Sequence, residues 1–216
     1  RRLKEAGAIV LAKVSTVNWY GNGEDGGYDP SQHPIGWTLN PYNLAYSPGG
    51  SSNGTGASIA AWFATVGLGT DTGGSVQMPS SYSSLVGMVG TQGLVSRAGI
   101  VPRGPTQDRA GPMTRHVFDT AAVFSVMAGY DIEDLTTANG IGHFPEGDWA
   151  SQLAAPDLKG MRIGVLREMI GEAKDPEVMA AFEQAVADLK AGGALIVDPV
   201  LTGTNLREFS NSDITG

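Results

Sequence analysis

The sequence predicts an α/β domain in which a mixed β-sheet is flanked by α-helices. One observation is a strand, a helix and a second strand in succession, over residues 161–166, 175–191 and 194–197. Another is a glycine-rich loop, a short helix, a strand and a second glycine-rich loop within residues 49–75. The third is the composition, because 216 residues with 41% hydrophobic side chains can bury one sizeable core. We therefore expect a single domain over residues 1–216.

The N-terminal segment predicts the end of a helix that stops at Gly7, followed by a strand over Ala8–Ala12 with Lys13 at its end. Residues 20–50 are crowded with Gly, Pro, Asn and Asp, which predicts a long loop. This region also carries aromatic residues, which either line a substrate pocket or pin the loop onto the core. They are Trp19, Tyr20, Tyr28, Trp37, Tyr42 and Tyr46.

The central stretch holds two loops in which hydroxyl residues are flanked by glycine pairs. The first is Gly49–Gly56 and the second is Gly69–Ser75. Glycine can adopt positive φ values, so such loops let several backbone N–H groups converge on one point. The segment between them would return the chain to its start and place Ser51 beside Ser75. This predicts an active site with two serines.

A helix and a strand are expected between the two loops. Small and apolar residues over Ala57–Ala64 predict a short helix, with Ser52 or Thr55 as its N-cap. Val66–Gly69 then predicts a buried strand.

Later elements follow from local signals. Leu85–Gly90 predicts a buried strand, and Val117–Met127 predicts a helix with Gly129 just past its end. Between Gly140 and Pro156 the periodicity lapses, which favours a surface loop.

The last predicted helix has the clearest start signal. Asp175 can act as N-cap, Pro176 suits the first helical position, and Glu177 complements the helix dipole. The helix should end at Gly192. With the strands on either side, it favours a parallel pair with a right-handed crossover.

Composition excludes several classes of protein. A net charge of -8 and a pI near 4.8 argue against a nucleic-acid surface, which needs clustered Lys and Arg. No apolar stretch reaches the 18 or more residues of a membrane span. The absence of cysteine excludes disulfides, thiolate metal sites and a cysteine nucleophile. We expect a cytoplasmic protein with no cofactor and no metal, and a homodimer as a further expectation.

The two loops read Gly-Gly-Ser-Ser-Asn-Gly and Gly-Thr-Asp-Thr-Gly-Gly-Ser, with Ser75 placed 24 residues after Ser51. This order and spacing resemble the amidase signature family of Ser-Ser-Lys amidohydrolases. The resemblance implies that Ser75 is the acyl-enzyme nucleophile and that Ser51, beside a cis peptide bond, relays protons. It also implies an oxyanion hole and supporting residues. The implied oxyanion hole is Thr72, Gly73 and Gly74, and the implied supporting residues are Ser52 and Asp71.

The implied activity is hydrolysis of a linear amide C–N bond through a seryl acyl-enzyme, with a small-molecule amide as substrate. Members of the family act on fatty amides, aryl amides, peptide C-terminal amides and glutamine with charged transfer RNA partners. The resemblance extends upstream to Asn40-Pro41 and downstream through Asp108–Met113 to the C-terminal strand, helix and strand.

The catalytic lysine of the family has no evident counterpart among the lysines of this chain. Lys13 lies at a predicted strand end, yet the segment from Lys13 to Trp19 resembles one that follows the catalytic lysine in the family. We therefore expect a central fragment, truncated at both ends, whose base lies upstream of Arg1. The fragment alone is expected to be inactive unless Lys13 serves as base.

Two positions depart from the family pattern. Gln77 stands where an arginine is common, so we expect Asp71 to be supported by backbone hydrogen bonds alone. Asn53 replaces a glycine, a milder change because Asn tolerates the left-handed region.

Two other functions remain open. A catalytically inactive fragment or binding subunit would keep the serine loop without a base. Alternatively, residues 50–54 match Gly-x-Ser-x-Gly, which would make Ser52 the nucleophile of an α/β-hydrolase with a histidine base. The histidines available for that role are His33, His116 and His143.

Overall fold

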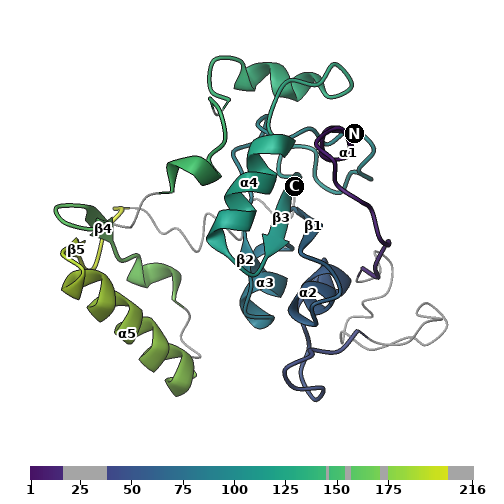
Figure 1. Ribbon diagram of the computed structural model, residues 1–216. Coiled ribbons are helices and arrows are strands. Elements are labelled where there is room, and N and C mark those ends of the chain that lie inside the picture. Colours follow the sequence, from purple (N-terminus) through teal and green to yellow (C-terminus); the bar gives the residue numbers. More distant parts are fainter. Residues whose placement is uncertain (17–37, 145, 154–156, 171–174, 204–216) are drawn as a thin grey trace. The chain divides into compact units, whose positions relative to one another are not determined.

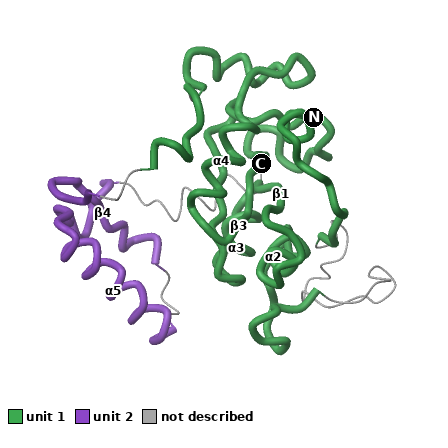
Figure 2. Tube along the Cα trace, viewed as in Figure 1, with its two compact units in different colours: residues 1–153 green, residues 154–216 purple. Residues whose placement is uncertain are grey.

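The computed structural model describes residues 1–16, 38–144, 146–153, 157–170 and 175–203. It contains two compact units, Arg1–Leu153 and Ala154–Gly216, which are coloured separately in Figure 2. The single domain over residues 1–216 stays a prediction. Within the described ranges, no helix is both long and apolar enough to cross a membrane.

Unit 1 holds most of the helices and strands, and Figure 1 labels the principal ones. In chain order they are α1 (Arg2–Glu5), α2 (Asn53–Ala60), β1 (Val66–Asp71), α3 (Gln77–Tyr82), β2 (Val86–Gly87), β3 (Arg109–Thr114), α4 (Val117–Met127) and the 3₁₀ helices η1 (Leu135–Gly140) and η2 (Ala150–Gln152).

The sheet of unit 1 is antiparallel and has the strand order β1-β3-β2. Leu68 of β1 lies opposite Pro112 of β3, and Val86 of β2 lies opposite Thr114. The sequence did not indicate β3, although it is the central strand. The predicted strand over Leu85–Gly90 forms only as the two residues of β2.

Helix α2 packs closely on β1 because two strand positions lack side chains. A Cβ atom at Gly67 would lie 2.4 Å from Thr55 Cγ2, and one at Gly69 would lie 2.7 Å from Ser52 Oγ. The helix begins at Asn53, four residues before the predicted start, and ends at Ala60. The glycines at these strand positions thus set the distance between the first serine loop and the strand leading to the second.

Helix α4 has the predicted bounds and packs along β3 (Figure 1). Its Phe124 is fully buried and stacks on Trp149, with ring centroids 5.3 Å apart. Ile59, Val76 and Met113 are also almost completely buried in unit 1. Both serine loops are therefore anchored to buried residues, since Ile59 belongs to α2, which follows the first loop, and Val76 follows Ser75.

The first residues form α1, as predicted, and Gly7 follows it with a φ of +93°. The strand predicted over Ala8–Ala12 is wrong, because these residues are outside any strand and their apolar side chains are exposed. A strand needs a neighbour that pairs with its backbone, and no described strand pairs with this segment. In its described residues, 140–144 and 146–153, the expected loop after Gly140 contains the short helix η2.

Unit 2 consists of β4 (Arg162–Gly164), the 3₁₀ helix η3 (Arg167–Met169), α5 (Pro176–Ala191) and β5 (Leu195–Val197). The parallel pairing of β4 with β5 is confirmed, and Ile163 lies opposite Ile196. The fold class is therefore confirmed as α/β with helices beside the sheets. Its parallel and antiparallel strands lie in two separate sheets.

Asp175 caps α5 as predicted. Its carboxylate accepts hydrogen bonds from the backbone N–H groups of Glu177 at 2.8 Å and Val178 at 3.3 Å. We expect Asp175→Ala to lower the free energy of unfolding of unit 2 by about 1 kcal/mol, since two N–H groups lose their acceptor. Chemical denaturation measures the loss. Asp175→Asn should retain most of the stability because asparagine also caps helices, and equal losses in the two variants would contradict the capping role.

Candidate active site

The two serine loops meet through backbone contacts, as predicted. The N–H of Ser52 donates to the carbonyl oxygen of Ser75 at 3.3 Å. Gly49 has a φ of +76°, and a Cβ atom there would lie 3.1 Å from the backbone of Met78 and Pro79 in α3. Because α3 begins two residues after Ser75, both contacts hold the first loop against the second.

Ser51 and Ser75 are both partly exposed, so a ligand can reach them. The peptide bond between Gly50 and Ser51 is cis, which is the arrangement that the family resemblance implies at this position.

Ser52 is buried and its hydroxyl links the first loop to β1. Its Oγ accepts from the N–H of Thr70 at 3.2 Å and donates to the Thr70 carbonyl at 3.3 Å. Ser52 occupies the N-cap position of α2 without a side-chain capping bond, which corrects the expected capping role. Thr55 lies within the helix, and its hydroxyl donates to the Leu68 carbonyl at 2.9 Å. Both hydroxyls therefore tie α2 to β1.

The α/β-hydrolase alternative finds no support in this arrangement. A nucleophile elbow exposes its serine at the end of a strand, whereas Ser52 is buried and no strand precedes it in residues 38–51. The two described histidines, His116 and His143, are exposed. His116 occupies the N-cap position of α4 without a side-chain capping bond.

Asp71 organises the backbone around the candidate nucleophile. The aspartate is almost fully buried, with 1% exposure, and its Oδ1 accepts from Gly74 N–H at 2.8 Å. Its Oδ2 accepts from Val76 N–H at 2.8 Å and from Gln77 N–H at 3.3 Å. The donors lie on both sides of Ser75, so one carboxylate fixes the loop before and after the serine.

The expectation that backbone hydrogen bonds alone support Asp71 is wrong. Arg109 forms an ion pair with it, with Nη2 3.7 Å from Oδ1, and the Gln77 amide lies 3.5 Å from Oδ2. Arg109 stands opposite Asp71 in the pairing of β1 with β3. The positive charge therefore comes from the neighbouring strand instead of from position 77.

The residues predicted as an oxyanion hole differ in what their N–H groups do. Gly74, with a φ of +116°, donates its N–H to Asp71. Within the described residues, the N–H groups of Thr72, Gly73 and Ser75 have no hydrogen-bond acceptor. The loop thus keeps unpaired donors next to the Ser75 side chain, and one of the three predicted donors is engaged elsewhere.

Lys13 is exposed, whereas a lysine that serves as base is usually buried. The segment that follows it rests on α2, because the Ser15 carbonyl accepts a hydrogen bond from Gly54 N–H at 3.1 Å. The other lysines in the described ranges are exposed as well, namely Lys4, Lys159 and Lys190. In the part of the chain that the structure describes, no lysine is buried beside the serines.

The segment ahead of the first loop is anchored by Asn40. This buried side chain donates to the Tyr82 carbonyl at 2.7 Å and accepts from the N–H of Tyr42 at 3.0 Å. Tyr42 and Tyr46 are exposed, so their rings do not pin the loop onto the core. The other aromatic residues of the predicted loop, and His33, lie outside the described residues.

The site can therefore support a nucleophilic hydroxyl, a second hydroxyl nearby and free backbone donors, which is the set of groups that acyl transfer uses. No group of three or more His, Asp or Glu that could hold a metal ion occurs among the described residues. The chain belongs to the Amidase family, whose model matches residues 1–206.

Two glutamyl-tRNA(Gln) amidotransferase subunits are similar to this chain over almost its whole length. A glutamyl-tRNA(Gln) amidotransferase subunit from Moorella thermoacetica is 41% identical over 206 residues, which are 94% of this chain and 40% of that protein. The corresponding protein from Nitratidesulfovibrio vulgaris is 43% identical over 208 residues, with the same two coverages. The chain thus spans about 40% of the length of these relatives.

Solved structures show the same fold. An amidase family protein from Bacillus anthracis has a TM-score of 0.80 and 36% identity, covering 92% of this chain and 39% of that chain. The native peptide amidase from Stenotrophomonas maltophilia has a TM-score of 0.76 and 37% identity, covering 92% of this chain and 40% of that chain.

Proposed function

We propose that the protein containing this chain is an amidohydrolase that cleaves a carboxylic amide C–N bond through a seryl acyl-enzyme. Ser75 is the nucleophile. The observation that carries the proposal is the position of Ser75 between backbone groups fixed by the buried Asp71 carboxylate and beside the loop of Ser51. Membership of the Amidase family supports the same reaction class.

In the proposed mechanism, Ser75 Oγ attacks the amide carbonyl and loses its proton to Ser51. Ser51 passes that proton on to a lysine that lies outside the residues of this chain. The N–H groups of Thr72 and Gly73 stabilise the oxyanion, and each such donor is worth about 2.7 to 4 kcal/mol in the barrier. The leaving amine takes a proton as the C–N bond breaks, and water then hydrolyses the ester.

A second candidate function is favoured by the names of the relatives. Proteins 41% and 43% identical to this chain are subunits of glutamyl-tRNA(Gln) amidotransferases. In that case the same serine would take the acyl group of an amide donor, and the released ammonia would pass to an acceptor instead of leaving. The two functions share Ser75 and differ in whether an acceptor consumes the ammonia.

The inactive fragment or binding subunit remains the alternative from another class. It is consistent with the exposure of every described lysine. Reactivity of Ser75 decides between this alternative and the enzyme.

The experiment is labelling with a serine-directed fluorophosphonate, followed by mass-spectrometric mapping of the modified residue. It is carried out on the complete protein and on this chain alone. Label on Ser75 in the complete protein, together with release of ammonia from a primary amide, supports the enzyme. Label on Ser52, or none in the complete protein, would contradict the proposal. Label on Ser75 in this chain alone would mean that a base within the chain activates the serine, and Lys13→Met would then test whether Lys13 is that base.

A further inference from the structure

A second buried carboxylate, Asp108, lies close to the serine loop and precedes β3. Its Oδ1 accepts a hydrogen bond from Thr72 Oγ1 at 2.5 Å. Its Oδ2 accepts from Arg103 N–H at 2.9 Å, and Gly104 N–H contacts both oxygens at 3.1 and 3.0 Å. Donors on both oxygens fix the orientation of the carboxylate. Apart from the Thr72 hydroxyl, these donors are backbone groups of its own turn.

The hydrogen bonds keep Asp108 charged. Burial is the largest single influence and raises the pKa, but the bonds from Thr72, Arg103 and Gly104 together with the charge of Arg97 lower it below its ordinary value. Asp108 is therefore an acceptor for Thr72 throughout the neutral range.

Thr72 is held through its hydroxyl, which is bound by Asp108. Its methyl carbon faces the turn of Asp108, since a Cβ atom added at Gly104 would come within 3.1 Å of it. Threonine is β-branched and has few side-chain rotamers, so the bond to Asp108 restricts the position of residue 72. Thr72 comes directly after β1 and three residues before Ser75, so this restriction acts on the loop of the nucleophile.

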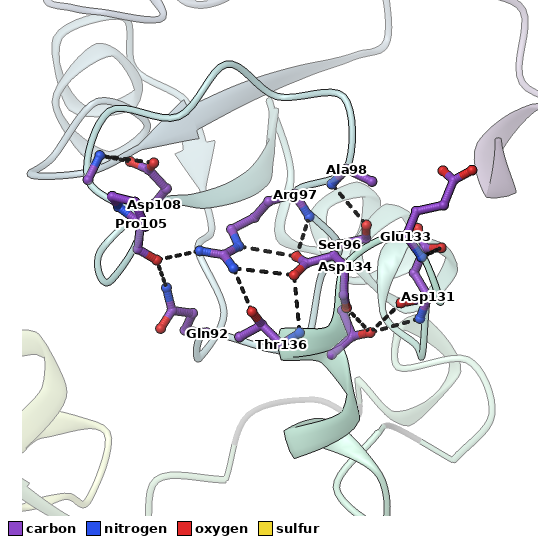
Figure 3. A network of polar contacts seen from close by, with 12 residues as sticks. Gln92, Ser96, Arg97, Ala98, Pro105, Asp108, Asp131, Glu133, Asp134 and Thr136 are labelled. Atoms are coloured by element: carbon purple, nitrogen blue, oxygen red, sulfur yellow. Dashed lines mark hydrogen bonds and ion pairs between the residues drawn. The ribbon is translucent and has the colours of Figure 1, made fainter.

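The turn that carries Asp108 is itself anchored, as Figure 3 shows. The Arg97 guanidinium donates to the carbonyl of Pro105 and forms an ion pair with the buried Asp134, with Nε 3.1 Å from Oδ2. It also donates to Thr136 Oγ1 at 2.6 Å, while the Gln92 amide donates to the same Pro105 carbonyl at 2.9 Å. The anchor for Asp108 thus extends to η1.

We propose that Asp108 is a positioning residue of the active site, which fixes Thr72 and through it the backbone N–H groups that stabilise the oxyanion. The proposal rests on the proposed function. Asp108 acts on the transition state through Thr72 without contacting the substrate.

The first test compares Thr72→Val with Thr72→Ser in the complete protein. Valine keeps the shape and removes the hydroxyl, so the loop loses its bond to Asp108. We expect kcat to fall by about 10²-fold, the cost of a small misplacement of catalytic groups. KM should stay near the wild-type value because the N–H groups act mainly in the transition state. Thr72→Ser keeps the hydroxyl and should retain most of the activity.

The second test combines Thr72→Val with Asp108→Ala. Alanine removes both carboxylate oxygens, so the Thr72 hydroxyl and the N–H groups of Arg103 and Gly104 lose their acceptor and the turn no longer holds Thr72. Each single variant should lower kcat, and the double variant should be little worse than the more impaired single variant, because both remove the same interaction. If the fold-losses in kcat of the two single variants multiply in the double variant, the two residues act separately, and the proposal is overturned.

Thr136→Val is the matched control, because it removes a threonine hydroxyl from the far end of the same network. Arg97 keeps its bonds to Asp134 and Pro105, so we expect wild-type kcat and a lower melting temperature. A loss of kcat equal to that of Thr72→Val would overturn the positioning role and leave a general structural one.

Failure of the proposed function is distinguishable from failure of this inference. A wild-type protein without Ser75 labelling or amide hydrolysis overturns both. A wild-type protein that is labelled and active, but whose Thr72→Val variant keeps the wild-type kcat, overturns the positioning role alone.

Discussion

Ser75→Ala is expected to lower kcat of the complete protein by about 10⁶-fold, the effect of removing a serine nucleophile from a comparable site. In the proposed mechanism, the substitution removes the atom that forms the acyl-enzyme. It should leave the loop in place, because Asp71 holds the backbone N–H groups of Gly74 and Val76, which alanine at position 75 does not change. Release of ammonia from a primary amide measures kcat, and the circular dichroism spectrum shows whether the fold is retained.

Ser58→Ala is the matched control for this prediction. Ser58 lies in α2, and its hydroxyl donates to the Thr55 carbonyl one turn back at 3.1 Å. The variant therefore loses a serine hydroxyl close to the first loop without losing a reacting group, and we expect wild-type activity. Near-wild-type activity in Ser75→Ala would identify another nucleophile, and Ser51→Ala would be the next variant to test.

The serine loops could be predicted because their signals are local. Glycine pairs around hydroxyl residues determine the loop conformation within a few positions, and the structure shows Gly49 and Gly74 with positive φ. The start of α5 is also local, since Asp175 caps N–H groups two and three residues away. Signals of this kind need no knowledge of the tertiary structure.

The central strand β3 could not be predicted by the same reasoning. Gly111 and Pro112 lie in its middle, and proline normally argues against a central strand because it has no N–H to donate. Here the carbonyl of Pro112 accepts from Met88 N–H at 3.1 Å. The ion pair between Asp71 and Arg109 was missed together with the strand, because the two residues meet only through the register of β1 and β3.

The bond between Thr72 and Asp108 was missed for a similar reason. The two residues are 36 positions apart, and nothing in the local sequence around Asp108 distinguishes it from an ordinary turn aspartate. The error at Ala8–Ala12 is the converse case. An apolar run predicts a strand, but strand formation depends on a partner whose presence the run itself cannot reveal.

The second large effect is expected from Asp71→Asn, which should lower the free energy of unfolding by about 3 kcal/mol and remove most of the activity. Asparagine has nearly the same shape, but its NH₂ group replaces one acceptor oxygen. In either orientation of the amide, a donor would face the N–H of Gly74 or the N–H groups of Val76 and Gln77. Chemical denaturation and the amidase assay measure the two losses.

Asp157→Asn is the control for the chemical change alone. Its carboxylate accepts one hydrogen bond, from Lys159 N–H at 2.9 Å in an exposed turn, and an asparagine oxygen can accept the same bond. We expect little change in stability. Similar losses in the two variants would contradict a special role for the buried carboxylate.

Arg109→Met separates the two kinds of support that Asp71 receives. The Arg109 nitrogen lies 3.7 Å from the carboxylate, beyond hydrogen-bond distance, and its side chain is 33% exposed. The backbone N–H groups, at 2.8 Å, are closer and are already fixed by the fold. We therefore expect Arg109→Met to cost clearly less stability than Asp71→Asn. An equal cost would mean that the charge of Arg109 on β3 stabilises the buried Asp71 side chain more than the backbone N–H groups of the Ser75 loop do.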